Sequence, residues 1–268
     1  MKKVLLYTTF LILLVLLFHN IRKNTIEKFN NKYNVIMTTY FFNNKDPQRN
    51  KTAPGNDIKY IKSWYESIKK LGLNGIVFHD GLSNDFIKKY QTNKIKFEYV
   101  NPKSFKYSLN DQRFVIYLDY LKKHPEIEKV FMTDGNDVKV VQDPFKYIKK
   151  AKYYVGSEEK TIGNSKWILH KFKILNKSNK YNSYFKENRL LNAGILGGGC
   201  DNIIKMLHKM RDIFNDYDES MLKSNFNMVV FNYVLYKYFP NNIVTRPPIH
   251  SLFKKYENNR KNVWFIHK

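Results

Sequence analysis

The chain has 268 residues, of which 43% are hydrophobic and 16% aromatic, and this apolar content excludes a disordered chain and suffices for one domain of ordinary size. A single cysteine, Cys200, excludes an intramolecular disulfide and a cysteine-clustered zinc or iron–sulfur site. The net charge of +24 is carried mainly by lysines spread along the whole chain without a zinc-finger, basic-zipper or RNP-like pattern, so we expect no specific nucleic-acid partner.

The first 22 residues differ in kind from the rest. Lys2 and Lys3 precede residues 4–18, a fifteen-residue run without charge. Such a helix spans ~22 Å, which is short of a ~30 Å hydrocarbon core and fits a signal peptide by length, but no pair of small residues marks a cleavage site. We therefore expect a hydrophobic signal anchor or transmembrane helix over residues 1–22, a polar linker over 23–32 and a folded domain over 33–268.

From residue 33 onward, short apolar runs alternate with amphipathic segments. The expected strands cover residues 34–41, 75–79, 96–100, 129–133, 153–156, 193–196 and 263–267. Three expected helices open at Asp57, Ser83 and Asn110, and the first of them ends at Gly72. Two more cover residues 202–214 and 226–238, and we expect a loop-rich section over 160–188. This alternation predicts βαβ units, and hence an α/β fold with a mainly parallel mixed sheet and helices on both faces.

Ligands of such sheets bind at the carboxyl ends of the strands, where this chain places polar residues. Asp80 follows the second strand, while Asp134 and Asp137 lie on the turn after the fourth. Two carboxylates ~5 Å apart repel by a few kcal/mol at an effective dielectric near 20, and a divalent ion such as Mg²⁺ or Mn²⁺ would remove that repulsion. The alternative is a capped turn whose aspartates bond local backbone amides.

Two motifs resemble those of one family. The run 130–138, which contains Asp134-Gly135-Asn136-Asp137 and is followed by an Asp-Pro-Phe at 143–145, resembles the metal-binding Asp-x-Asp region of GT-A fold glycosyltransferases in an Asp-x-x-Asp variant. Residues 191–198, Leu-Asn-Ala-Gly-Ile-Leu-Gly-Gly, are similar to a segment found downstream in the same families. A membrane anchor before a catalytic body is also their common layout. The resemblance covers roughly residues 33–268 and implies the GT-A, Rossmann-like nucleotide-diphospho-sugar transferase fold.

The resemblance implies a metal-dependent glycosyltransferase that moves a sugar from a UDP- or GDP-sugar to a glycan, glycoprotein or glycolipid acceptor. Asp134 would lie near the ribose and the metal, and Asp137 would ligate Mn²⁺ or Mg²⁺. Residues implied in donor binding are Thr38, Thr39, Tyr40, Asp80, Arg113, Asp134, Asn192, Ala193 and Gly194. For Arg113 an ordinary surface arginine is the alternative. The catalytic domain would be lumenal, in the Golgi or ER, if the source is eukaryotic or viral.

One position departs from the family pattern. Asn227 stands where many of these enzymes carry an aspartate, and its amide does not titrate. The catalytic base then lies elsewhere, with Glu158 and Glu159 as candidates, or the reaction retains configuration and needs no protein base. A catalytically inactive binding protein with the same fold is an alternative, and a basic nucleic-acid-binding protein, supported by charge alone, is a third.

The last apolar run delivers His267 to the carboxyl edge of the sheet. Many GT-A enzymes are similar in using a C-terminal histidine as a metal ligand, so we expect His267 to join Asp134 and Asp137 on the cation. Neutral imidazole suits Mn²⁺ better than Mg²⁺. His250 is the competing candidate. The structural alternative is a solvated histidine at a frayed chain end, and we expect residues 267–268 to contribute little to stability.

Overall fold

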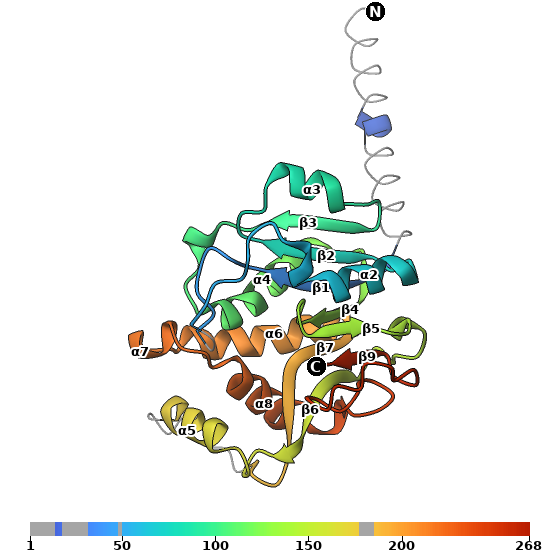
Figure 1. Ribbon diagram of the computed structural model, residues 1–268. Helices are drawn as coiled ribbons and strands as arrows, with labels where there is room; N and C mark the ends of the chain where they lie inside the picture. The colour runs from blue at the N-terminus through green and yellow to red at the C-terminus, as the bar shows by residue number, and fades with distance from the viewer. Residues whose placement is uncertain (1–13, 18–31, 48–49, 177–184) are drawn as a thin grey trace, which may run out of the picture.

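The computed structural model describes residues 14–17, 32–47, 50–176 and 185–268. Its main sheet consists of β1 (Tyr33–Tyr40), β2 (Gly75–His79), β3 (Ile95–Tyr99), β4 (Ile127–Thr133), β6 (Tyr153–Thr161), β7 (Arg189–Gly199) and β8 (Ile243–Val244). The strand order is β3-β2-β1-β4-β7-β6-β8 (Figure 1). Strands β1 to β4 are parallel, and β7 runs antiparallel to both β4 and β6. The predicted mixed, mostly parallel sheet is confirmed.

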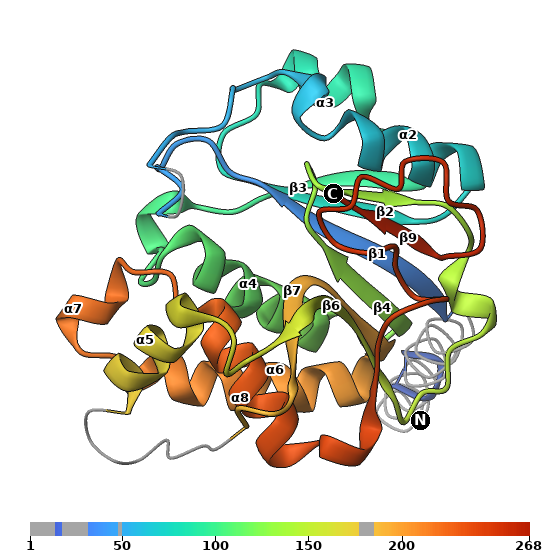
Figure 2. The ribbon, with the colours of Figure 1, turned by 60° about the horizontal axis from the view of Figure 1, so that its bottom comes forward.

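Helices cover both faces of this sheet, as predicted. On one face lie α2 (Lys62–Leu71) and α3 (Asn84–Tyr90), and on the other lie α4 (Leu109–Lys123), α6 (Cys200–Asn215) and α8 (Asn227–Tyr238) (Figure 2). Each face has its own apolar core, one built on Trp64 and Ile68 of α2 and the other on Phe114 of α4 and Phe231 of α8. Fully burying one such side chain contributes roughly 1.5–3 kcal/mol, so the two cores fix the position of the sheet edge between them.

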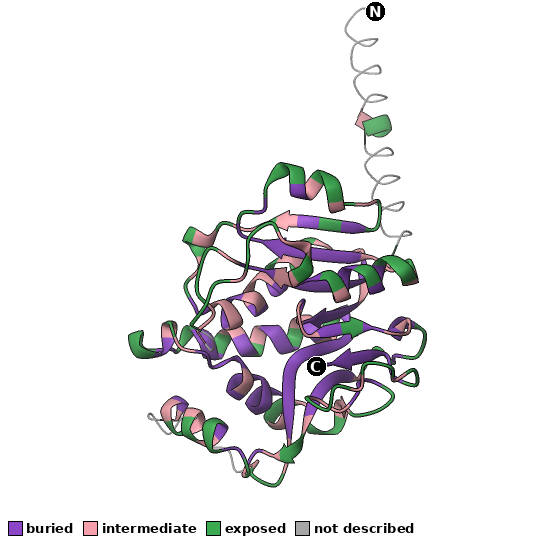
Figure 3. Cartoon of the chain, viewed as in Figure 1, coloured by how far each residue is buried: buried purple, intermediate pink, exposed green. Residues whose placement is uncertain are grey.

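A short antiparallel ribbon lies beside the main sheet. It pairs β5 (Val138–Val140) with β9 (Phe265–His267), which is shorter than the predicted terminal strand. Strand β5 was not predicted, because three residues are too few to show a hydrophobic period. The ribbon joins the chain end to the acidic turn, and most of β1, β4, β7 and β9 is buried (Figure 3).

Several predicted boundaries require correction. Asp57 caps a 3-10 turn, Ile58–Tyr60, and α2 begins only at Lys62; it ends at Gly72, as predicted, in a left-handed conformation (φ 63°). Helix α4 begins at Leu109, because Ser108 rather than Asn110 has the extended backbone of a cap and accepts from the N–H of Asp111. Ser83 caps α3 as predicted.

The section predicted to be loop-rich contains α5 (Lys166–Leu175). Ile168 and Leu175 are its buried residues, seven positions apart on one helix face, and the lysines between them hid this pattern in the sequence. The remaining short elements are α7 (Glu219–Leu222) and the 3-10 turns Pro102–Ser104, Pro144–Lys146 and Pro240–Asn242.

The predicted N-terminal anchor lies almost entirely outside the described residues. Residues 14–17 of it are described and are helical. Across the described ranges, no helix has the length and apolar character needed to cross a membrane.

Candidate functional site

The acidic turn begins where β4 ends. Thr38 on β1 donates a hydrogen bond from its hydroxyl to the Thr133 carbonyl oxygen (2.9 Å), and Trp64 Nε1 donates to Thr133 Oγ1 (2.9 Å). Thr38 is buried and Thr39 half-buried. These contacts fix the end of β4 from both neighbouring elements, so Asp134 leaves a rigid strand.

A bulge in β7 faces this turn. Val155 of β6 pairs with Leu196 and Gly156 pairs with Asn192, so residues 193–195 have no partner on β6. Within the bulge, Asn192 Oδ1 accepts the Gly194 N–H (2.9 Å). Bulges often re-aim backbone groups beside active sites, and here the bulge carries residues 193–195 toward β4.

Asn232 of α8 holds the start of the bulge. Its Oδ1 accepts the Leu191 N–H (2.9 Å), and its Nδ2 donates to the Leu191 carbonyl oxygen (2.9 Å). Asn232 is fully buried. The sequence signal for it is a polar residue within the otherwise apolar run of residues 228–235. Asn232 therefore replaces ladder hydrogen bonds that the bulge removes.

Arg113 ties the bulge to the acidic turn. Its Nη1 donates to Asp134 Oδ1, and its Nη2 donates to the Ala193 carbonyl oxygen (3.2 Å). The Asp134 N–H in turn donates to the Gly194 carbonyl oxygen (2.9 Å). Burial alone would lower the pKa of Arg113, but Asp134 and other groups outweigh it and the pKa is raised, so the guanidinium stays charged. The side chain is only 11% exposed, so the alternative of a surface arginine is wrong.

His267 and Asp134 converge over Gly194. A Cβ atom built on Gly194 would lie 2.7 Å from Asp134 Oδ2 and 2.7 Å from His267 Nε2. Only a residue without a side chain lets the carboxylate and the ring approach the β7 backbone this closely. Gly197 lies in the same strand, and the Phe131 ring occupies the place where its side chain would be.

The His267 ring is buried, and its Nδ1 has no hydrogen-bond partner among the described residues. Burial lowers the pKa of this imidazole to about 4, although Asp134 opposes the shift. The ring is therefore neutral near pH 7, the form that binds metals. The His267 N–H donates to Ser251 Oγ (2.9 Å), so the alternative of a solvated histidine at a frayed chain end is wrong.

Asp137 lies beside His267 through the ribbon. Its carbonyl oxygen accepts the Lys268 N–H (2.9 Å), and Val138 pairs with His267. Two carboxylates and one imidazole form a donor set that suits Mn²⁺. In the part of the chain that the structure describes, no group of three or more His, Cys, Asp or Glu side chains lies close enough to hold a metal ion. The structure thus brings two candidate ligands together, Asp134 and His267. The third, Asp137, precedes Val138, the residue that pairs with His267.

The competing histidine, His250, has both ring nitrogens in use. Nε2 accepts the Arg246 N–H (3.2 Å), and Nδ1 donates to the Ser251 carbonyl oxygen (2.6 Å). This assignment of donor and acceptor leaves no lone pair for a metal. His250 thus supports the segment before β9 and is a weaker candidate than His267.

Two of the expected donor-binding residues hold the loop after β1. The Asp80 carboxylate accepts the N–H groups of Phe42 and Asn43 (3.0 Å each) and is buried. The Tyr40 hydroxyl donates to the Asp57 carbonyl oxygen (3.0 Å). In this arrangement both side chains position the loop at the carboxyl edge, and a direct contact with a donor remains a prediction.

Of the two candidate bases, only Glu158 connects to the bulge. Asn192 Nδ2 donates to Glu158 Oε1 (3.4 Å), and Lys160 lies 3.0 Å from Glu158 Oε2. Glu159 is exposed and pairs with Lys255 (3.6 Å). Asn227 is buried at the start of α8, where its Oδ1 accepts the Met228 N–H (2.8 Å).

Asp111, a buried carboxylate near the site, was not among the residues predicted from the sequence. It accepts the Phe226 N–H at Oδ1 (3.2 Å), which links α4 to α8. Burial raises its pKa to about 7, opposed by the backbone of α8, Arg113 and Tyr217. Lys171 of α5 also faces it, and burial lowers the pKa of that ammonium group. This carboxylate is therefore partly ionised near neutral pH without solvent contact.

Cavities of about 740 Å³ and about 540 Å³ lie elsewhere, and neither is lined by Asp134, Gly194 or His267. The convergence of Arg113, Asp134 and His267 lies instead at the carboxyl edge of the sheet, where open α/β sheets bind their ligands. No protein-family model matches this chain, and no curated protein matches it.

Proposed function

We propose that this chain is a glycosyltransferase of the GT-A type, which transfers a sugar from a UDP- or GDP-sugar to a glycan, glycoprotein or glycolipid acceptor. The convergence of Arg113, Asp134 and His267 around Gly194 supports this proposal most strongly. It lies at the carboxyl end of β4, and open α/β sheets bind their ligands at that edge. The α/β fold and the order of the two sequence motifs agree with it.

Under this proposal Asp134, Asp137 and His267 hold Mn²⁺ or Mg²⁺. A cation bound there supplies positive charge to the diphosphate of the donor as that group leaves. Arg113 holds the Asp134 carboxylate in one orientation and adds a fixed positive charge beside it. Because Gly194 has no side chain, the Asp134 carboxylate and the His267 ring can both lie against its backbone.

The acceptor side of the site is proposed to involve Glu158. Asn192 orients this carboxylate from the bulge, and Glu158 would accept the proton of the acceptor hydroxyl in an inverting reaction. A second candidate function is a donor-binding protein without turnover. Asn227 favours it, because its amide cannot titrate and is engaged with the helix backbone.

The same proposal assigns residues 1–22 as a single-pass anchor with the catalytic domain in the lumen of the Golgi or ER, if the source is eukaryotic or viral. The uncharged run 4–18 and the absence of a cleavage signal support the anchor. An anchored enzyme of this type meets glycoprotein and glycolipid acceptors at the membrane.

The test is a screen of UDP- and GDP-sugars in which release of the nucleoside diphosphate is measured with Mn²⁺, with Mg²⁺ and with a chelator. We expect slow hydrolysis of one donor class that requires the metal. Binding of a donor without release, in the presence of candidate acceptors, would favour the protein without turnover. No binding of any nucleotide sugar under any metal condition would contradict the proposal.

A further inference from the structure

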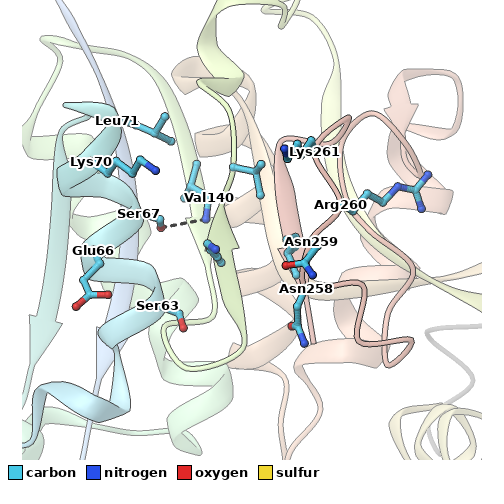
Figure 4. A pocket seen from close by; sticks show the side chains of 13 residues that line it. Ser63, Glu66, Ser67, Lys70, Leu71, Val140, Asn258, Asn259, Arg260 and Lys261 are labelled. Atoms are coloured by element: carbon cyan, nitrogen blue, oxygen red, sulfur yellow. Dashed lines mark hydrogen bonds between the residues drawn. The ribbon is translucent and has the colours of Figure 1, made fainter.

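The larger of the two cavities described above lies between α2, β5 and residues 258–261 (Figure 4), and no residue of the candidate site lines it. Its volume is about 740 Å³, within the range of small-molecule pockets. The Val140 N–H of β5 donates to Ser67 Oγ of α2 (3.1 Å), and this hydrogen bond connects the strand to the helix. The hollow, which we call the α2–β5 groove, is therefore built by regular elements that are distant in sequence.

The α2–β5 groove has a marked excess of positive charge. Lys70, Lys139, Arg260 and Lys261 line it together with a single carboxylate, that of Glu66. Among the described residues, no ion pair involves Lys70, Lys139 or Lys261. Three ammonium groups from three separate segments thus share one hollow without a protein counter-charge of their own.

The other two charged groups are already paired. Arg260 Nη1 lies 2.8 Å from Glu257 Oε2, outside the groove lining. Glu66 lies 3.8 Å from Lys62, and both side chains are largely exposed. Glu66 thus brings one negative charge to a groove with three lysines, and the lining keeps a net positive charge.

Uncharged hydrogen-bond donors accompany the lysines. The side chains of Ser63, Asn258 and Asn259 line the same groove, the first from α2 and the other two from the C-terminal segment (Figure 4). Each ammonium group offers three donors and no acceptor, and charge-assisted bonds to oxyanions are stronger than neutral ones. The chemistry that matches such a lining is an anion with several oxygen acceptors.

We propose that the α2–β5 groove is a binding site for a phosphate or sulfate group, separate from the candidate active site. The proposal does not depend on the glycosyltransferase assignment, because it uses no residue of that site. The anionic group comes from a soluble phosphorylated or sulfated molecule or from a lipid headgroup. The walls of the groove raise the local potential above that of the scattered surface lysines.

The test compares two triple variants of the full chain that lose the same charge. The groove variant carries K70Q, K139Q and K261Q, and the control carries K88Q, K89Q and K205Q, three exposed lysines on α3 and α6. Binding of inorganic phosphate and of inorganic sulfate is measured by calorimetry at low salt. Sedimentation with phosphatidylglycerol vesicles and with phosphatidylcholine vesicles forms the second arm.

We expect the groove variant to lose at least tenfold in affinity for phosphate or sulfate, and the control to change less than twofold. A selective loss of phosphatidylglycerol binding in the groove variant would identify a lipid headgroup as the source, and unchanged vesicle binding would identify a soluble one. Equal losses in the two variants would overturn the proposal, because they would show that only the overall charge of +24 matters. The absence of measurable binding in the unmodified chain would overturn it as well.

Discussion

Substituting Gly194 by alanine perturbs the candidate site at its centre. The added Cβ would lie 2.7 Å from Asp134 Oδ2 and from His267 Nε2, and 2.8 Å from His267 Cε1. Comfortable contacts of carbon atoms are ~3.5–4.0 Å, so the carboxylate and the ring must retreat by roughly 0.8–1.3 Å. Displacements of that size reduce the activity of positioned groups by ~100-fold, and overpacking costs about 1–3 kcal/mol.

We therefore expect Gly194→Ala to weaken Mn²⁺-dependent binding of UDP or GDP by about 10- to 100-fold, measured by calorimetry. The matched control is Gly75→Ala at the amino end of β2, where the added Cβ would lie 2.9 Å from the Trp64 ring. The control should lose similar stability in urea denaturation while nucleotide binding stays within about twofold. If both variants bind the nucleotide equally well, the convergence over Gly194 does not form the binding site.

Three further predictions separate metal ligands from supporting residues. His267→Ala should reduce Mn²⁺-dependent nucleotide binding at least tenfold, whereas His250→Ala should lower thermal stability and leave binding intact; the reverse result would transfer the ligand role to His250. Because burial raises the pKa of Asp111 from 3.8 to about 7, its contribution to stability is full below pH 4 and is lost as the pH rises through 7. Asparagine does not titrate, so the difference in free energy of unfolding between Asp111→Asn and the unmodified protein should shift by roughly 4 kcal/mol in favour of the variant from pH 4 to pH 8. Parallel pH profiles of the two proteins would refute this. Asn232→Ala should lower the free energy of unfolding by about 2–4 kcal/mol, because it leaves the Leu191 N–H and carbonyl oxygen without Asn232 as a partner. The control Asn202→Ala loses one exposed hydrogen bond to Lys150 and should lower it by less than about 1 kcal/mol. Equal losses would argue against the role of Asn232 in holding the bulge.

The sequence was sufficient for the fold class and for the edge of the sheet that carries the polar residues. Strand β4 and Asp134 were placed correctly because an apolar run followed by an acidic turn is a local pattern. Ser83 and Gly72 were assigned correctly as caps for the same reason, since caps depend on a few neighbouring residues.

The tertiary features of the site were beyond sequence reasoning. Arg113 lies on α4, 21 positions before Asp134, and its contact with that carboxylate depends on how α4 packs on the sheet, which no local pattern reveals. The bulge at residues 193–195 depends on Asn232, which is distant in the chain. The β5–β9 ribbon buries His267 at the chain end, where sequence position alone suggests fraying.

The most direct test of the central claim is the metal dependence of nucleotide binding in Asp137→Asn. Its matched control is Asp143→Asn, which removes the same charge on the other side of β5 while its side-chain oxygen still caps the turn Pro144–Lys146. UDP and GDP are titrated calorimetrically with Mn²⁺ and with a chelator. Our prediction is that the unmodified chain and the control bind one nucleotide only with Mn²⁺, and that Asp137→Asn loses at least tenfold in affinity. Equal, metal-stimulated binding by Asp137→Asn and its control would contradict it.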